Sequence, residues 1–376
     1  MLKKMLALAA ASIMVFAAGC NNAGNIGGSE ATDVIKIGGI GPLTGSASSY
    51  GISVKQGAEV AIDEINAAGG VEGKQLELIF EDDENDEQKS LNAYSTLMDK
   101  NINVLMGSVT SACSIAVSGA SEVDGILQIT PSGSAKECAA APNAFRICFT
   151  DPLQGEVMAQ YIKDAGITKV AMIYNNGDEY SKGIHDAFAT KAQEIGIEIV
   201  SDESFTKDDI DFKTQLTKVN SSGAECIFLP IYYSEVAMIS EQAASLGIDL
   251  PYYGCDGWDG VIKQVDGDTK NLDGSTFLTP FVANDETPKI KDFVTKYNER
   301  FNADPDQFAA DGYDAVYAIK LAVEHTGGDL SNEALIDAMT KINLDGLTGN
   351  MTFDTNGEPN KSAKVAVIEN GAYIAK

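Results

Sequence analysis

Two short turns rich in hydroxyl groups and glycine are the parts of this 376-residue sequence best suited to binding a small anion. Residues 107–111 read Gly-Ser-Val-Thr-Ser and follow the apolar run 104–106. Residues 131–134 read Pro-Ser-Gly-Ser and follow the run 126–130. Backbone N–H groups and hydroxyls gathered in such turns make a site for a carboxylate. We therefore expect these turns to hold the acidic end of a small molecule.

The segments around the turns indicate why the two should lie together. Residues 104–106 and 126–130 have the short apolar character of buried strands, and residues 112–123 favour a helix between them. In a parallel sheet both turns then fall at the carboxyl edge, where open α/β sheets bind ligands. Ser111 and Ser134, one from each turn, are the predicted contacts. Either serine could instead cap a helix, a common role for this residue.

An alternation of strand and helix occurs twice along the chain. Expected strands lie at 34–40 and 76–80, and again at 170–174, 197–200, 226–230 and 251–254. In both series the loop after the first strand carries a tyrosine at the start of a helix, Tyr50 and then Tyr180. This duplication, in a chain longer than one core usually serves, predicts two lobes that face each other across a cleft. The last hundred residues mix helices and strands and are expected to cross back between the lobes.

The first twenty residues read as an export signal. Lys3 and Lys4 precede the apolar run 5–16, and Ala-Ala-Gly precedes Cys20. Ala-Ala-Gly-Cys resembles the lipobox of bacterial lipoproteins, in which the cysteine is lipidated; a plain secretory signal is the alternative. The apolar run is shorter than the roughly 20 residues that span a membrane. Residues 21–32, rich in Gly, Asn and Ser, predict a flexible tether. We expect a protein anchored by lipid to the outer face of the cell membrane, or a periplasmic one.

Charge and cysteine content narrow the possible partners. The formal net charge of −28 repels nucleic acid and anionic membrane, so neither is expected as a partner. Beyond Cys20 the five cysteines form no C-x-x-C pair, and the acidic run 81–87 lacks the spacing of a calcium loop. We therefore expect no metal site and no cofactor. Cys113 and Cys138, which follow the two turns, are candidates for a disulfide, and His185 is expected on a helix surface.

Six motifs taken together resemble those of one protein family. They are Ile-Gly-Pro-Leu-Thr-Gly at 40–45, Asp-Glu-Ile-Asn-Ala-Ala-Gly-Gly at 63–70, Ile-Thr-Pro-Ser at 129–132, Gly-Asp-Glu-Tyr-Ser-Lys-Gly at 177–183, Gly-Cys-Asp-Gly-Trp at 254–258 and Met-Thr-Phe-Asp-Thr-Asn-Gly at 351–357. In this order they resemble the substrate-binding proteins of bacterial branched-chain amino acid ABC transporters, the Leu/Ile/Val-binding family. The resemblance covers nearly all of residues 33–376.

The resemblance implies the type I periplasmic binding protein fold. This is an α/β fold of two Rossmann-like lobes with three crossovers and a hinged cleft. The N-terminal lobe would comprise residues 33–151 and 281–349, and the C-terminal lobe residues 152–280 and 350–376. The protein would act as a monomer that delivers its ligand to an ABC permease. The disulfide of well-known members is not expected, because Asn85 and Thr110 stand at its positions.

The resemblance also implies roles for individual residues. Ser111 and Ser134 would bind the α-carboxylate of an amino acid. Backbone groups near Ser132 would assist, its carbonyl accepting from the α-ammonium. Asp256 would bind the α-ammonium, although the best-known members have Glu there. Four aromatic residues match positions near the ligand, and of these Tyr50 and Tyr313 would lie by its side chain: Tyr50, Tyr180, Tyr232 and Tyr313.

Simple chemistry agrees with this division. A zwitterion needs hydrogen-bond donors at one end and a negative acceptor at the other, and charge-assisted bonds of this kind are strong. If the two ends of the ligand bind to different lobes, only the closed state makes both sets of hydrogen bonds. Ligand binding then shifts the equilibrium from the open to the closed state. Asp256 could still be an ordinary turn residue, because Asp-Gly is a turn signal. The tyrosines could likewise be half-buried packing residues.

Other functions remain to be weighed against amino acid binding. A serine hydrolase is disfavoured because Gly-x-Ser-x-Gly does not occur, and two histidines supply little general base chemistry, so we expect no enzyme. The same fold could serve as a ligand sensor, or could bind an amide, urea or an aromatic acid. Branched-chain aliphatic amino acids are the expected ligands.

Overall fold

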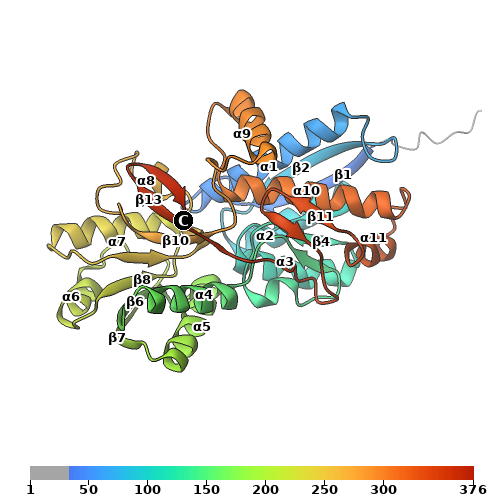
Figure 1. Ribbon diagram of the computed structural model, residues 1–376. Coiled ribbons are helices and arrows are strands. Elements are labelled where there is room, and N and C mark those ends of the chain that lie inside the picture. The colour runs from blue at the N-terminus through green and yellow to red at the C-terminus, as the bar shows by residue number, and fades with distance from the viewer. Residues whose placement is uncertain (1–33) are drawn as a thin grey trace, which may run out of the picture. The chain divides into compact units, whose positions relative to one another are not determined.

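The computed structural model describes residues 34–376 (Figure 1). The expected signal peptide at 1–20, the lipidated Cys20 and the tether at 21–32 lie outside the described residues. Among residues 34–376 no helix combines the length and the apolar character needed to cross a membrane. The same residues contain no group of His, Cys, Asp and Glu side chains arranged to hold a metal ion.

The first lobe is built on a five-stranded parallel sheet with the order β2-β1-β3-β4-β5. Its strands alternate in which face they bury: Ile35 and Ile37 point to one face, and Ile40 points to the other. The strands are β1 (Val34–Gly41), β2 (Gln75–Asp82), β3 (Val104–Met106), β4 (Gln128–Thr130) and β5 (Ala144–Arg146).

Helices cover both faces of this sheet. α1 (Ser48–Ala67) and α10 (Gln307–His325) pack against each other on one face, so closely that a Cβ at Gly57 would overlap the Ala309 carbonyl. α2 (Glu87–Asp99) and α3 (Ser111–Asp124) cover the other face. The remaining elements of this lobe are η1 (Lys136–Ala139), α9 (Pro288–Phe301), α11 (Asn332–Met339) and the hairpin of β11 (Leu344–Gly346) and β12 (Gly349–Met351).

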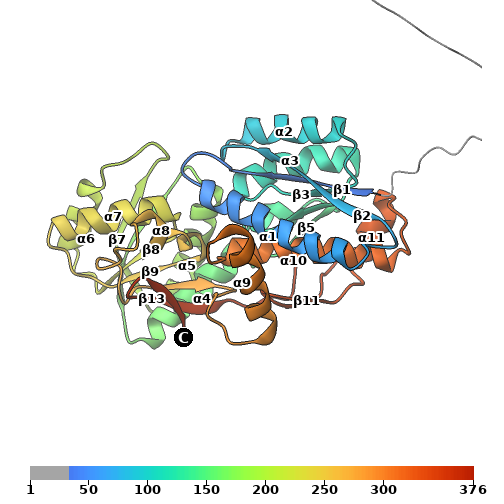
Figure 2. The same ribbon diagram turned by 90° about the horizontal axis from the view of Figure 1, so that it is seen from above.

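The second lobe is built on a seven-stranded sheet with the order β14-β13-β10-β9-β8-β6-β7 (Figure 2). Five strands pair in parallel, and the last two add to one edge in antiparallel fashion. The strands are β6 (Lys169–Asn175), β7 (Glu198–Phe205), β8 (Cys226–Leu229), β9 (Tyr252–Gly254), β10 (Thr276–Thr279), β13 (Lys364–Glu369) and β14 (Ala372–Ala375).

The helices of the second lobe also divide between two faces. α4 (Asp151–Asp164) and α5 (Glu179–Ile195) bury apolar side chains on one face, and α6 (Lys213–Ser221) and α7 (Tyr233–Ser245) on the other. α4 was not expected from the sequence, although Pro152 in its first turn and the Thr150 cap are ordinary signs of a helix start. The short elements η2 (Asp256–Trp258) and α8 (Val261–Gln264) follow β9.

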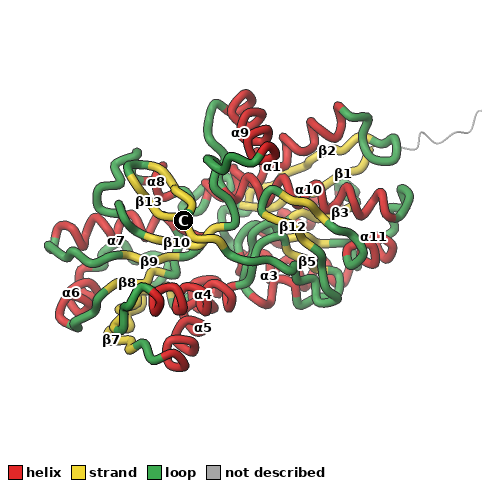
Figure 3. Tube along the Cα trace, in the orientation of Figure 1, coloured by secondary structure: helices red, strands yellow, loops and turns green. Residues whose placement is uncertain are grey.

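The chain passes between the two sheets three times, through the segments 147–150, 280–287 and 352–363 (Figure 3). Polar contacts tie the third passage to the first lobe. Lys361 Nζ donates to the Ile147 carbonyl at 2.8 Å and to Thr348 Oγ1 at 2.7 Å. Arg146 Nε lies 2.8 Å from Glu358 Oε2. These contacts hold two of the three passages side by side.

Two expectations about single residues are wrong. Cys113 and Cys138 are free and buried, because they face different partners: Cys113 Sγ approaches Asn85 Oδ1 at 3.9 Å, and Cys138 Sγ approaches the Ser111 carbonyl at 3.6 Å. His185 is not on the surface but only 8% exposed. It stacks on Tyr174, and its ring nitrogens lie 2.8 and 3.0 Å from carboxylates on α5 and β7.

Candidate ligand-binding site

A small cavity lies between the carboxyl edges of the two sheets and receives residues from both lobes. Its volume is about 10 Å³, at the lower limit for a single water molecule and far too small for an amino acid. A ligand can therefore enter only if the lobes part or the lining side chains move. The first lobe contributes Tyr50, Val109, Thr110, Ser111, Ser132 and Phe308, and the second contributes Tyr180, Tyr232, Asp256 and Gly257.

The two hydroxyl turns lie side by side in the first lobe, as expected from the sequence, and they are bonded to each other. Ser111 Oγ accepts from the backbone N–H groups of Ser134 and Ala135, both at 3.1 Å. Ser132 Oγ donates to the Val109 carbonyl at 2.7 Å. Ser111 is therefore not a helix cap; its hydroxyl holds the second turn against the first.

The start of α3 adds free donors to these turns. The N–H of Ser114 bonds to the Thr110 carbonyl at 2.9 Å, and Thr110 makes no side-chain cap. The amides of residues 111–113 precede that first helical bond and have no intrahelical acceptor. Together with the helix dipole they favour an anion at this end of the cavity.

Ser134 is placed differently from Ser111 and Ser132. It is buried behind the cavity, and its Oγ has no hydrogen-bond partner among residues 34–376. The carboxylate of Asp151, at the start of α4, is also fully buried, and neither of its oxygens has a partner among these residues. Burial raises the pKa of Asp151 well above its usual range. The sequence marked Asp151 only as the start of a new segment, because nothing local shows that it faces this site.

Asp256 lies across the cavity, on the second lobe. Its Oδ1 accepts from the Tyr180 hydroxyl at 2.7 Å, and its backbone N–H donates to Gln154 Oε1 at 3.0 Å. Burial raises the pKa of Asp256 to about 6. A desolvated carboxylate of this kind favours a cationic partner, because an opposite charge would stabilise its ionised form.

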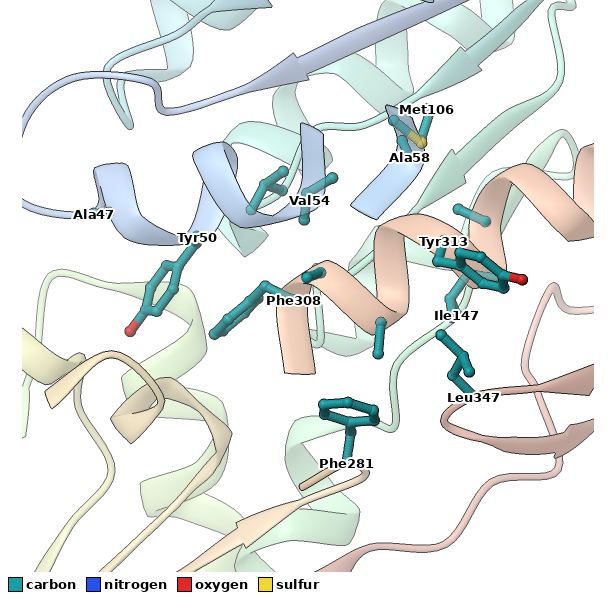
Figure 4. Close-up of a cluster of buried hydrophobic side chains, with 14 of the residues drawn as sticks. Ala47, Tyr50, Val54, Ala58, Met106, Ile147, Phe281, Phe308, Tyr313 and Leu347 are labelled. Carbon is teal, nitrogen blue, oxygen red and sulfur yellow. The ribbon is translucent and has the colours of Figure 1, made fainter. Parts of the chain in front are cut away.

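Aromatic rings form the remaining walls. Tyr180 and Tyr232 stack with ring centroids 4.8 Å apart. Tyr50 lies 4.1 Å from Phe308 and 5.4 Å from Tyr232, and Figure 4 shows Tyr50 and Phe308 side by side at the ends of α1 and α10. The Tyr50 hydroxyl donates to the Gly257 carbonyl and so joins the two lobes directly. These rings enclose an apolar space between the polar ends.

Tyr313 does not join this group. It does not line the cavity; its hydroxyl donates to Glu64 Oε2 at 2.7 Å, and its ring stacks on Tyr317. Five residues separate it from Phe308 on α10, which turns its side chain about 140° around the helix. Figure 4 shows Tyr313 farther along α10, away from Tyr50. Phe308, one of the cavity's own residues, was missed by sequence reasoning.

The side chains of Thr110 and Asn85 contact each other in the first lobe. Thr110 Oγ1 donates to Asn85 Oδ1 at 2.8 Å. In well-known members of the family that this sequence resembles, a disulfide is expected at these two positions. Here a hydrogen bond joins the same two segments, so the turn before α3 is tied to the loop after β2 without a covalent link.

Two α/β lobes that face each other across a cavity, with donors on one side and a buried carboxylate on the other, define a solute-binding protein with a hinged cleft. The chain belongs to the periplasmic binding protein family, whose sequence model matches residues 34–372. The family comprises solute-binding proteins of ABC transporters and not enzymes.

Several relatives resemble the whole described chain. Leu/Ile/Val-binding protein homolog 3 of Brucella melitensis is 32% identical over 330 residues, which cover 86% of this chain and 88% of the relative. A leucine-binding protein from Thermotoga maritima has a TM-score of 0.85 at 28% identity, covering 91% of this chain and 97% of its own. A branched-chain amino acid binding protein from Streptococcus pneumoniae, in complex with isoleucine, has a TM-score of 0.84 at 29% identity and covers 91% of this chain and 100% of its own.

These similarities confirm the expected family and fold class. Membership in a family of periplasmic binding proteins implies a location outside the cytoplasm.

Proposed function

We propose that this chain binds a branched-chain aliphatic amino acid in the cavity between its lobes and delivers it to an ABC permease. The observation that carries the proposal is the division of the site. Ser111 and the open amides of α3 lie on one lobe, and the desolvated carboxylate of Asp256 lies on the other. An α-carboxylate suits the first and an α-ammonium the second.

The apolar walls support an aliphatic side chain. The rings of Tyr50, Tyr232 and Phe308 line the cavity and carry no charge, so they suit an apolar side chain on the ligand. Ser132 would assist at the carboxylate end, and Tyr180 would orient Asp256 through its hydroxyl. Ser134 would act through its backbone N–H, which fixes the Ser111 hydroxyl.

We further propose that residues 33–151 with 281–349, and 152–280 with 350–376, move as two bodies about the three connecting segments. Closure would form the bond between Tyr50 and Gly257 and exclude water from the ligand. The protein would act as a monomer, held at the outer face of the membrane by lipid on Cys20 and reaching the permease through the tether at 21–32.

Thermal unfolding in the presence of single compounds tests the ligand. Leucine, isoleucine and valine are each expected to raise the melting temperature, since a ligand at 100 times its Kd adds roughly 2.7 kcal/mol of stability. Two leucine analogues are the matched controls: 2-hydroxyisocaproate lacks the ammonium, and isoamylamine lacks the carboxylate. Both should shift the melting temperature far less than leucine does. If acetamide, urea or benzoate raises the melting temperature and the amino acids do not, the protein binds a different class of ligand.

Two tyrosine variants test which tyrosine belongs to the binding site. Tyr50→Phe removes the hydroxyl that joins the lobes and should weaken leucine binding about fivefold, the effect of one lost hydrogen bond. Tyr313→Phe should leave binding within about twofold and lower the free energy of unfolding by about 1 kcal/mol, because only its bond to Glu64 is lost. Calorimetric titration and denaturant unfolding measure the two effects. A larger loss of affinity in Tyr313→Phe than in Tyr50→Phe would place the site elsewhere.

A further inference from the structure

A second cavity, much larger than the first, lies at the junction of the two lobes on the other side of the η2 turn. Its volume is about 440 Å³, within the range of small-molecule sites. The second lobe contributes the segment 259–263 and the hairpin residues 371–373, and the first contributes the loop 303–306 before α10. Segment 281–284 of the second passage completes the lining. Figure 1 shows α8, α9 and the C-terminal strands around this region.

The lining is apolar with one polar end. The apolar wall consists of Ile262, Phe281, Val282, Ala303, Pro305 and the ring of Tyr373. The polar end carries the carboxylates of Asp259 and Asp306, which are 3% and 8% exposed. Such a cavity suits a compact molecule with an apolar body and a single charged or polar group.

The two carboxylates at the polar end are satisfied unequally. Asp306 caps α10, where its Oδ1 accepts from the Ala309 N–H at 3.0 Å and its Oδ2 accepts from Ser53 Oγ at 2.6 Å. Asp259 Oδ2 accepts from the Gln307 N–H at 2.9 Å, but its Oδ1 has no partner among residues 34–376. A buried carboxylate oxygen without a donor is costly. The accessible surface of Asp259 Oδ1 is below 1 Å², so a ligand's donor reaches it only when the lining side chains move.

The charges that face Asp259 leave room for one more cation. Lys263 Nζ lies 3.7 Å from Asp306 Oδ2, beyond hydrogen-bond length, and its side chain is 56% exposed. The Tyr373 hydroxyl accepts from the Gly260 N–H at 3.0 Å. Asp304 adds a further acid at the rim. Burial, and then the neighbouring carboxylate of Asp306, raise the pKa of Asp259 well above its usual range.

We propose that this cavity is a second ligand site, which takes a small organic amine with its ammonium on Asp259 and its apolar body against Phe281, Pro305 and Tyr373. The site is linked to the cleft through Gln307, which bonds to residues of both cavities. Gln307 donates from its backbone to Asp259 and from its side chain to the Asp256 carbonyl. An amine at the junction would therefore stabilise the contact between α10 and the η2 turn, across which the lobes meet.

Binding of an amine has a proton signature. An alkylammonium stays charged at neutral pH, as lysine does. Because the pKa of Asp259 is raised, its protonated form must release a proton to the buffer when the ammonium pairs with it. By linkage, the amine's affinity rises with pH over the range in which Asp259 titrates, and binding there releases protons.

Calorimetric titration of the purified protein with cyclohexylmethylamine tests the proposal. At pH 7 the heats measured in phosphate and in Tris should differ, because the protons that Asp259 releases ionise the buffer. Cyclohexylmethanol, which has the same body without the charge, should bind at least about tenfold more weakly at pH 8. Equal affinity of the two compounds, or no proton release, would overturn the proposal.

Four variants locate the site. Asp259→Asn keeps an acceptor for the Gln307 N–H but should weaken the amine at least about tenfold and abolish proton release. Ala303→Phe fills the cavity without touching a carboxylate and should also block binding. Asp304→Asn, the matched loss of charge at the rim, should change affinity less than about threefold. Asp256→Asn should also retain the amine; loss of binding in that variant alone would place the amine in the cleft and overturn the proposal.

Discussion

Replacing Asp256 with asparagine is expected to remove high-affinity amino acid binding while stabilising the unliganded protein. The carboxylate would pair with the ligand's ammonium in a dry site, and losing one partner of such a pair costs roughly 2–5 kcal/mol, or about 10²- to 10³-fold in affinity. Asparagine keeps an oxygen for the Tyr180 hydroxyl, so the local fold is retained. Calorimetric titration with leucine measures the loss.

The gain in stability has a defined pH dependence. Burial raises the pKa of Asp256 from 3.8 to about 6, so the ionised form is disfavoured in the folded protein. Below pH 4 the carboxyl is protonated in both the folded and the unfolded states, and asparagine brings no advantage from this source. The advantage grows between pH 4 and pH 6 and then stays constant at about 3 kcal/mol, at 1.36 kcal/mol per pKa unit. Denaturant unfolding at pH 4 and pH 8 measures it.

Glu235→Gln is a matched control for this result. Glu235 lies on the same lobe, and burial raises its pKa as well, but it does not line the cavity. Its amide variant should change leucine affinity less than about threefold. If Asp256→Asn binds leucine like the parent protein, the assignment of the ammonium site is wrong. If it is less stable than the parent at pH 8, the electrostatic argument is wrong.

Replacing Arg146 with methionine is expected to cost roughly 3–5 kcal/mol of unfolding free energy, because three backbone carbonyls and the partly exposed Glu358 carboxylate lose their buried donor. The guanidinium is fully buried. Nη1 donates to the carbonyls of Gly133 and Ala135 at 3.0 and 2.8 Å, and Nη2 donates to the Lys136 carbonyl at 3.0 Å. Its remaining contacts are to Glu358 in the third passage between the lobes.

Arg146→Met should also weaken ligand binding, because the carbonyls that it orients belong to the second hydroxyl turn. Glu358→Gln is the control: that side chain is partly exposed and keeps an acceptor, so it should lose no more than about 1.5 kcal/mol. Arg146→Lys should recover part of the loss by supplying a charge without the planar fork. Denaturant unfolding and leucine titration measure both effects. An Arg146→Met protein as stable as its parent would show that this network is not what holds the turn.

Much of the first lobe's site could be predicted, because its signals are local. The hydroxyl turns after β3 and β4 follow short apolar strands, and parallel strands bring such turns to one edge. Ser132, Tyr180 and Asp256 lie within the motifs that carry the family resemblance, and the structure places them at one cavity with Tyr50, Ser111 and Tyr232. All six residues lie in or just after the loops that follow strands.

The sequence by itself determined the alternation of strands and helices and the presence of two lobes, because hydrophobic periodicity and turn residues act over a few positions. The family followed from the resemblance of its six motifs. Only the tertiary structure decided which side chains meet across long separations. The turn of α10 that separates Tyr313 from Phe308, the different partners of Cys113 and Cys138, and the burial of Arg146 against residues 133–136 and Glu358 are of this kind. So is the unpartnered carboxylate of Asp259 at the lobe junction. Such contacts depend on helix rotation and lobe packing, and no pattern of neighbouring residues encodes them.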